Sequence, residues 1–440
     1  MKVLLIGGTG VLSTDIRELS IKKNYEVYIL NRGRNKNDNL SEKVNFIKGD
    51  IRQVEKLKDY FKDKYFDVVV DFLSYCERDI KDTLDIFNNK CNQYIFISSA
   101  TAYRKTEKGE RITEDYELSN PNWKYAEGKK ECEDYLKINY EKNKQKYTIV
   151  RPYVTYSDTR IPFAIIPHEK QWTLANRILN NKPIVLWDNG TATCTLTSTK
   201  DFAVGIVGLF GNEKAYNEAF HITTDYTLTW YEALQYIGKA LGKEVIVANI
   251  PSKYIISVMP DLKGVLLGDK GLDREFDNTK IKSAVPEFNA QIKFEDGIKS
   301  TIEFYKNNKF MQDIDYGWDA RIDNLIHKYN KQKPSFINNF NPKSITNSFN
   351  KNQTTKEKII YYIYKNDFTY LCCDLFFKFK KSLGKIKRKI KKYIKWKNTV
   401  RNIIKGYIIY LEILWWLLKG LINTIAIYEN CYKRIKYINK

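Results

Sequence analysis

The first fifteen residues restrict the fold of this chain more than any other stretch. Lys2–Ile6 is an almost wholly apolar run with the length of a strand that is buried on both faces. It leads directly into the glycine-rich segment Gly7–Gly10, and from Val11 onward apolar residues recur at helical spacing. Glycines let a backbone approach a phosphate closely, and a helix N-terminus attracts its negative charge. The segment therefore predicts an anion-binding turn between a strand and a helix.

Apolar runs of strand length continue to alternate with helical patterns along the chain. The runs that predict strands are Tyr25–Leu30, Val44–Lys48, Asp67–Phe72, Tyr94–Ser98, Tyr147–Arg151 and Pro183–Trp187. The patterns that predict helices are Val54–Phe61, Arg78–Asn88, Tyr125 to about Tyr140 and Trp172–Asn180. Strands that alternate with helices through short connections form a parallel sheet with helices on both faces. We therefore predict an α/β fold built on a doubly wound parallel sheet.

The end of the second predicted strand bears on the choice between NAD and NADP. In dinucleotide-binding folds an acidic residue at this point holds the ribose 2′-hydroxyl, whereas an arginine accommodates a 2′-phosphate. At this point the chain has Asn31 and Arg32, followed by Arg34, and no acidic residue. We therefore expect NAD(P) as the cofactor, with a preference for NADP. The alternative is that both arginines are solvated and that Asn31 holds the ribose of NAD.

Residues suited to acid–base chemistry follow the fifth predicted strand. Ser99 lies at its end, and Tyr125 and Lys129 are four residues apart on the next predicted helix. Side chains at this spacing share a helix face, so we expect the ammonium group to lower the phenol pKa and make the tyrosine an acid–base catalyst. The serine hydroxyl can orient the substrate oxygen. A Tyr-x-x-x-Lys pattern alone is weak in a chain with 32 tyrosines, so its position after this strand carries the argument.

Together these motifs resemble those of extended short-chain dehydrogenases, in the NAD-dependent epimerase/dehydratase family. They are Gly7-Gly8-Thr9-Gly10, residues 98–103 (SSATAY), Tyr125-x-x-x-Lys129 and residues 151–156 (RPYVTY). The likeness covers about residues 1–310 and implies a Rossmann domain over 1–160, with a smaller substrate-binding region over 161–330 interleaved with it. It implies that the catalytic residues are Ser99, Tyr125 and Lys129. It further implies that the cofactor contacts Gly7, Gly8, Gly10, Ser13, Asn31, Arg32, Asp50 and Ile51.

The resemblance narrows the reaction to a few alternatives. Sugar-nucleotide dehydratases of the family carry an Asp-Glu pair directly after the catalytic Ser or Thr, where this chain has Ala100 and Thr101, so dehydration is disfavoured. Epimerisation and reduction need only the Tyr, Lys and Ser side chains, and both stay open. A second class also stays open, since some relatives bind a dinucleotide but act as RNA-binding or structural proteins. Relatives commonly form homodimers, which we expect here as well.

We expect a small, sugar-type substrate. Many family members that act on nucleotide sugars grip the diphosphate with an arginine, and this chain has Thr191–Thr195 in that place. Arg160 and Arg177 are candidates to replace it, and Thr101 is a further candidate contact to the substrate.

The positive charge of the chain is concentrated near its C-terminal end. Residues 341–440 hold 23 Lys and Arg against five Asp and Glu, so they carry +18 of the formal charge of +22. Residues 331–356 are rich in Asn, Ser, Lys and Pro and predict a linker, and residues 357–440 predict a basic helical tail. Lysines between bulky aliphatic residues suit an anionic membrane surface and disfavour nucleic acid, whereas Glu412 and Lys419 argue against a membrane-spanning helix. The alternative is an extension without a role.

Cysteine and histidine usage predicts neither disulfides nor a metal site. Seven cysteines show no C-x-x-C pair, and the three histidines are dispersed, with His221 in an apolar run typical of a packed strand. No signal-peptide pattern precedes the first strand. We therefore expect a cytoplasmic protein whose tail associates with the inner face of the membrane.

Overall fold

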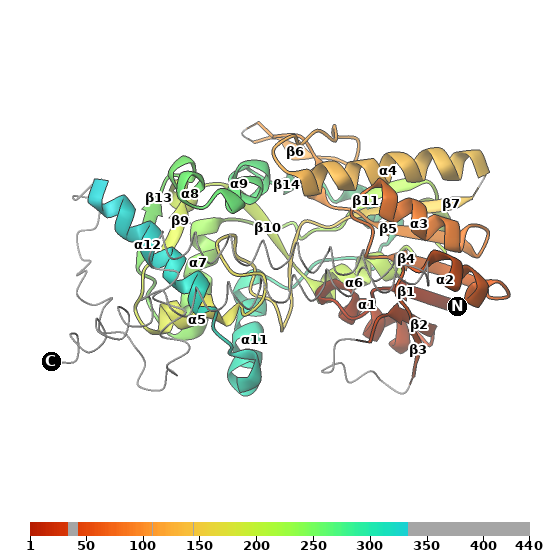
Figure 1. Ribbon diagram of the computed structural model, residues 1–440, viewed down its shortest axis with the longest axis horizontal. Coiled ribbons are helices and arrows are strands. Elements are labelled where there is room, and N and C mark those ends of the chain that lie inside the picture. Colours follow the sequence, from red (N-terminus) through yellow and green to blue (C-terminus); the bar gives the residue numbers. More distant parts are fainter. Residues whose placement is uncertain (34–42, 108, 144, 333–440) are drawn as a thin grey trace, which may run out of the picture. The chain divides into compact units, whose positions relative to one another are not determined.

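The computed structural model describes residues 1–33, 43–107, 109–143 and 145–332 (Figure 1). Arg34 and the predicted basic tail lie outside these residues, and the first two residues of the predicted linker end the last described helix. No helix within the described ranges is both long and apolar enough to cross a bilayer.

Among the described residues, seven parallel strands form the central sheet, in the order β11-β7-β5-β4-β1-β2-β3. They are β1 (Lys2–Ile6), β2 (Glu26–Asn31), β3 (Val44–Lys48), β4 (Phe66–Asp71), β5 (Cys91–Ile97), β7 (Lys146–Arg151) and β11 (Glu218–His221). Since β1 lies between β2 and β4, the strand order reverses at this point of the sheet. The predicted doubly wound parallel sheet is confirmed.

The two faces of this sheet bury separate apolar cores because side chains alternate along each strand. In β1, Val3 and Leu5 belong to one core, and Leu4 and Ile6 belong to the other. The first core is covered by α1 (Val11–Lys22), α6 (Thr199–Gly208) and α10 (Thr279–Ala284). The second is covered by α2 (Val54–Phe61), α3 (Glu77–Phe87) and α4 (Lys124–Asn143), on the opposite side from α1 and α6 in Figure 1.

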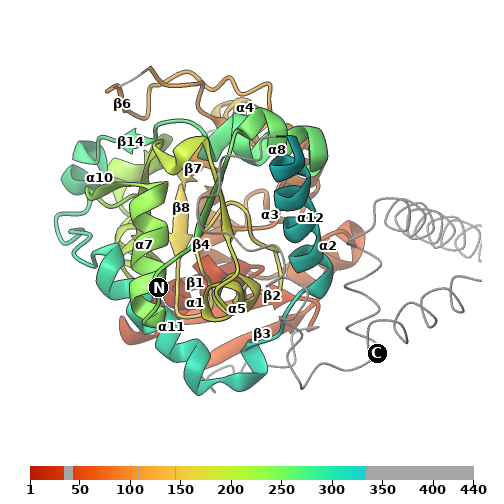
Figure 2. The same ribbon diagram turned by 90° about the vertical axis from the view of Figure 1, so that its left-hand side faces the viewer.

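A second region is built from short strands and helices around its own core, which contains Trp187 and Trp230. Its small sheets are formed by β8 (Val154–Tyr156) with β10 (Thr193–Ser198) and β12 (Thr227–Thr229), and by β9 (Ile184–Trp187) with β13 (Val247–Ile250). Strands β6 (Arg111–Ile112) and β14 (Glu275–Phe276) form a further pair. Its helices are α5 (Trp172–Leu179), α7 (Trp230–Leu241), α8 (Ser252–Val258), α9 (Lys263–Val265), α11 (Phe294–Asn307) and α12 (Tyr316–Gln332). Helix α12 packs against α5 and α8 (Figure 2).

Candidate functional site

A pocket of about 390 Å³ opens beyond the carboxyl ends of β1, β2 and β4. This is the point at which the strand order reverses, where open α/β sheets bind their ligands. Five of the residues predicted to contact a cofactor line this pocket: Gly7, Asn31, Arg32, Asp50 and Ile51. The other three, Gly8, Gly10 and Ser13, belong to the turn and first helical turn that follow β1.

The turn after β1 has the backbone geometry that a phosphate group requires. Gly7 has a φ of +93°, and a Cβ atom at this position would lie 2.8 Å from the Leu73 side chain. The N–H of Gly10 donates to the hydroxyl of Ser13 over 2.8 Å, so Ser13 closes the turn. Helix α1 begins at Val11 and has no acidic residue in its first turn. The residues present therefore fit the pyrophosphate of a dinucleotide.

The side chains at the far end of this pocket are mostly engaged with one another. Asn31 donates to the Thr9 hydroxyl over 3.2 Å and accepts from the Gly33 N–H over 2.7 Å. Asp50 accepts two hydrogen bonds from the Arg52 side chain, at 2.9 and 2.6 Å, and one from its backbone N–H, at 3.2 Å. The side-chain bonds lower the pKa of the Asp50 carboxyl most, and Arg32 has a smaller effect in the same direction. Arg32 is exposed at the rim, which leaves its guanidinium accessible to a ribose phosphate.

The end of β5 positions the Ser99 hydroxyl. Its Oγ lies 2.9 Å from the hydroxyl of Thr101 and accepts a 3.3 Å hydrogen bond from the Thr101 N–H, which begins a short 3₁₀ turn. The neighbouring Ser98 instead donates to the buried carboxylate of Glu133 over 2.6 Å. Ser99 is therefore the serine that faces the predicted tyrosine, and Thr101 supports it.

Helix α4 places Tyr125 and Lys129 on its inner face. Between them, a Cβ atom at Gly128 would lie only 2.3 Å from the Tyr75 carbonyl oxygen, so the absence of a side chain lets α4 approach the loop after β4. In this position the buried Lys129 Nζ donates to the carbonyls of Ser74 (2.7 Å) and Ile97 (2.8 Å) and lies 5.9 Å from the centroid of the Tyr125 ring. Backbone carbonyls thus hold the ammonium group under the phenol.

The net shift of the Tyr125 phenol pKa is upward in this structure, opposite to the expected direction. Burial raises the pKa of Tyr125 to about 12, and the opposing effects of the Ser99 hydroxyl and Arg160 are smaller. Burial also lowers the pKa of Lys129 to about 8. Desolvation exceeds the charge–charge attraction here because both groups lie among apolar and aromatic side chains. Tyr125 is therefore a protonated phenol at neutral pH, in the form that donates a proton.

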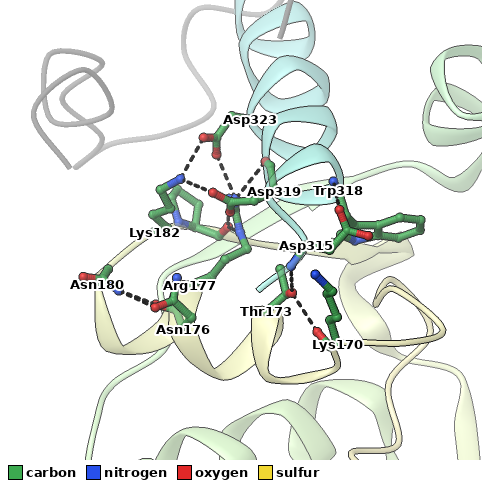
Figure 3. A network of polar contacts seen from close by, with 11 residues as sticks. Lys170, Thr173, Asn176, Arg177, Asn180, Lys182, Asp315, Trp318, Asp319 and Asp323 are labelled. Carbon is green, nitrogen blue, oxygen red and sulfur yellow. Dashed lines mark hydrogen bonds and ion pairs between the residues drawn. The ribbon is translucent and has the colours of Figure 1, made fainter. Parts of the chain in front are cut away.

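The two arginines predicted to contact the substrate have different surroundings. Arg160 follows β8, and its guanidinium acts electrostatically on the Tyr125 phenol. Arg177 on α5 instead pairs with Asp319 and, over 2.9 Å, with Asp323 of α12, and donates to the Pro183 carbonyl over 2.8 Å (Figure 3). Its donors are consumed by these contacts, so Arg177 joins two helices and is not retained as a substrate contact.

Several groups at the site were not identified from the sequence. They are Ser74, Tyr75, Asn120, Asp269 and Lys270, which contact the predicted residues through tertiary packing. Gly128, a glycine inside helix α4, was the one sequence signal that another segment, the loop after β4, approaches this helix.

Polar groups beside the sheet form a further buried network. His221 is fully buried, as expected of a packed strand residue, and its Nε2 lies 2.7 Å from the Asp277 carbonyl oxygen.

No cluster of three or more His, Cys, Asp or Glu side chains in the described ranges could hold a metal ion.

Sequence comparison with protein families agrees with this geometry. A model described as "NAD dependent epimerase/dehydratase family" matches residues 3–222. The chain belongs to this family. The matched segment runs from β1 to one residue beyond β11, so it contains all the strands of the central sheet as well as Ser99, Tyr125 and Lys129.

Two curated relatives resemble parts of this member of the epimerase/dehydratase family. The chloroplast stem-loop binding protein of 41 kDa b from Arabidopsis thaliana is 26% identical over 253 residues, which cover 55% of this chain and 63% of that protein. A bifunctional UDP-glucose 4-epimerase and UDP-xylose 4-epimerase from Pisum sativum is 25% identical over 150 residues, which cover 28% of this chain and 43% of that protein. The chain thus spans less than two thirds of the length of either relative.

Solved structures of the family share the fold. An epimerase from Methanothermobacter thermautotrophicus superposes with a TM-score of 0.59 at 18% identity. The match covers 71% of this chain and 94% of the Methanothermobacter chain. UDP-glucose 4-epimerase from Thermus thermophilus in complex with NAD superposes with a TM-score of 0.56 at 19% identity. This match covers 70% of this chain and 99% of the Thermus chain. At this level of identity the likeness concerns the fold alone.

Proposed function

We propose that this protein is an NAD(P)-dependent epimerase or reductase that acts at a carbinol carbon of a sugar-type substrate. The observation that carries the proposal is the convergence of Ser99, Tyr125 and Lys129 at the carboxyl end of β5, next to a pocket that fits a dinucleotide. The names of the Thermus and Pisum relatives, both UDP-glucose 4-epimerases, support a sugar substrate.

Each side chain of the proposed set has a distinct task. A bound nicotinamide would supply the acceptor or donor of the hydride. The Tyr125 phenol would move the proton of the substrate hydroxyl or carbonyl oxygen, and the Ser99 hydroxyl would orient that oxygen. Because the Lys129 ammonium group donates to two backbone carbonyls, it stays under the phenol and stabilises the phenolate that forms when Tyr125 gives up its proton.

A second function is favoured by one comparison. Of the two curated relatives, the one that matches over 253 residues is named as a stem-loop binding protein. In this alternative the chain is a catalytically idle dinucleotide-binding module that binds RNA or serves as a membrane-tethered scaffold. It predicts that a stem-loop RNA binds the full chain in a mobility-shift assay, and that the Tyr125→Phe variant binds it equally well.

The nucleotide that the purified full chain carries tests the enzymatic proposal. Denaturation should release bound cofactor, or an empty protein should bind NADPH or NADH in a fluorescence titration. Retained oxidised NAD indicates an epimerase that regenerates its cofactor, whereas an empty site that binds NADPH indicates a reductase. A protein that neither retains nor binds a nicotinamide nucleotide refutes the proposal.

We further propose that NADP is the preferred form, with the Arg32 guanidinium against the 2′-phosphate. Arg32→Ala should then weaken NADPH binding about tenfold, the value of one charge-assisted contact, and leave NADH binding unchanged. Fluorescence titration of both nucleotides measures this. Arg111→Ala is the control, because Arg111 is an exposed arginine of β6 that does not line this pocket. A wild-type protein that prefers NADH contradicts the proposal.

The tail outside the described residues is proposed to hold the protein at an anionic membrane surface. The full chain should sediment with vesicles that contain phosphatidylglycerol, and a chain that ends at residue 335 should stay in the supernatant. Equal behaviour of both chains contradicts a tether.

A further inference from the structure

The loop after β4 holds the ammonium group of Lys129, and a buried carboxylate holds this loop. Asp71, the last residue of β4, is fully buried. It accepts hydrogen bonds from the N–H groups of Leu73 (2.8 Å) and Ser74 (3.3 Å) and from the Ser74 hydroxyl. Since the Ser74 carbonyl accepts from the Lys129 Nζ over 2.7 Å, Asp71 fixes the acceptor that positions the lysine.

The surroundings of the Asp71 carboxyl group favour its ionised form. A fourth hydrogen bond comes from the hydroxyl of Tyr94 on β5, over 2.8 Å. An ionised carboxylate accepts all four hydrogen bonds, whereas a protonated oxygen would lose one of them. The four donors are uncharged, so none of these contacts balances the charge. A buried charge is costly unless a counter-charge lies nearby, which indicates that the carboxylate acts on a neighbouring cation.

Lys129 is the cation on which this charge acts. The residue is 2% exposed, and both acceptors of its Nζ are backbone carbonyls. Burial lowers the pKa of Lys129 to about 8, and the largest effect in the opposite direction comes from the charge of Asp71. The other titratable side chains that act on the ammonium group or lie against it are Cys132 and Glu133 on α4, Asp79 on α3, and the phenols of Tyr75 and Tyr125.

The two other carboxylates of this set are engaged elsewhere. Glu133 pairs with the Arg151 guanidinium, at 2.7 Å from Nη2 and 2.9 Å from Nε, so its charge is balanced within that pair. Asp79 is partly exposed and accepts from the Tyr75 N–H over 3.1 Å, so water screens its charge. Asp71 is therefore the carboxylate whose charge is left to balance Lys129.

We infer that Asp71 is a positioning residue for the proposed reaction: its carboxylate clamps the loop after β4 against Lys129 and keeps this lysine charged. The inference rests on the proposed function and adds a residue of the central sheet that acts through Lys129. An ammonium group stabilises the phenolate that forms when Tyr125 gives up its proton, and a neutral amine does not. Asp71 thereby extends proton transfer by Tyr125 towards higher pH.

The titration of Lys129 in the ligand-free full chain tests this role without a substrate. Lysine Cε atoms are labelled with carbon-13, and the Lys129 signal, assigned with Lys129→Met, is followed by NMR as the pH is raised. The wild-type midpoint should lie near a pKa of about 8. Asp71→Asn, which keeps the size of the side chain, should move the midpoint to lower pH by about one pH unit, as loss of one opposite charge implies.

Two outcomes of this titration overturn the inference. One is a midpoint that Asp71→Asn leaves unmoved. The other is a wild-type midpoint below neutral pH, because Lys129 would then be neutral despite Asp71; this measurement decides the question even if Asp71→Asn does not fold.

Tyr94→Phe is the matched control, because it removes one hydrogen bond to Asp71 and leaves the charge. It should lower the melting temperature and leave the titration of Lys129 unchanged, and a merely structural role of Asp71 predicts the same result for Asp71→Asn. With an identified substrate, kcat of Asp71→Asn should decline at a lower pH than kcat of the wild type. Cofactor titration of the same samples reports separately on the proposed function, since the charge of Lys129 is measured without a nucleotide.

Discussion

Replacing Tyr125 by phenylalanine is expected to lower kcat by about a hundredfold to ten-thousandfold, since a positioned acid–base group contributes roughly 10²–10⁴ in rate. The ring remains, so its packing against Trp123 (5.2 Å between centroids) and Tyr75 (6.2 Å) is retained and the fold should be unaffected. Steady-state kinetics with the identified substrate measures the loss, and cofactor titration shows whether the dinucleotide pocket is intact.

Tyr75→Phe is the matched control for this variant. Tyr75 also lies near Lys129, whose Nζ is 4.6 Å from the centroid of its ring, but its hydroxyl has no assigned task in proton transfer. Its removal should change kcat less than about tenfold. If Tyr125→Phe keeps full turnover and Tyr75→Phe loses it, the acid–base role belongs to the loop after β4 and the assignment made here is wrong.

The second large effect is expected at the ion pairs between α5 and α12. Arg177→Met removes a partner that Asp319 and Asp323 share and leaves two buried carboxylates beside Lys182, at 2.7 and 3.0 Å. Loss of one partner from a buried pair costs about 3–5 kcal/mol because the remaining charge stays desolvated. The free energy of unfolding, measured by urea denaturation, should fall by this amount.

Arg321→Gln is the control for Arg177→Met. Arg321 also lies on α12 and pairs with Asp261, but this pair is partly exposed, so its loss should cost less than about 1 kcal/mol. A cost of Arg177→Met as small as that of Arg321→Gln would show that the network does not stabilise the fold.

The central sheet could be predicted from the sequence because its inner strands β1, β4 and β5 are buried on both faces and consist largely of apolar residues. β1, β3 and α2 begin and end at the predicted residues. Strands β6, β8, β12 and β14 were not predicted, since two or three residues carry no periodicity and tertiary pairing defines them. The longer strands β10 and β13 were not predicted either.

At the candidate site, the sequence supplied residue types and order but not their surroundings. The phenol pKa was predicted in the wrong direction because spacing reveals a neighbouring lysine and does not reveal burial. Arg160 and Arg177 looked equivalent in the sequence. They are distinguished by the packing of α12, some 140 residues beyond Arg177, since Asp319 and Asp323 pair with Arg177. Among the described residues, no carboxylate pairs with Arg160.

The path of the chain between its two regions limits how the site can open and close. The chain passes from one region to the other near residues 98–103, 113–123, 152–153, 199, 222–226, 277–278 and 285–293, since α4, α6, β11 and α10 return to the central sheet. A hinge needs a few residues that absorb a rotation, and here every crossing would have to bend in concert. Admission of substrate should therefore rely on local loop and side-chain movement, and heating should unfold both regions in one cooperative transition.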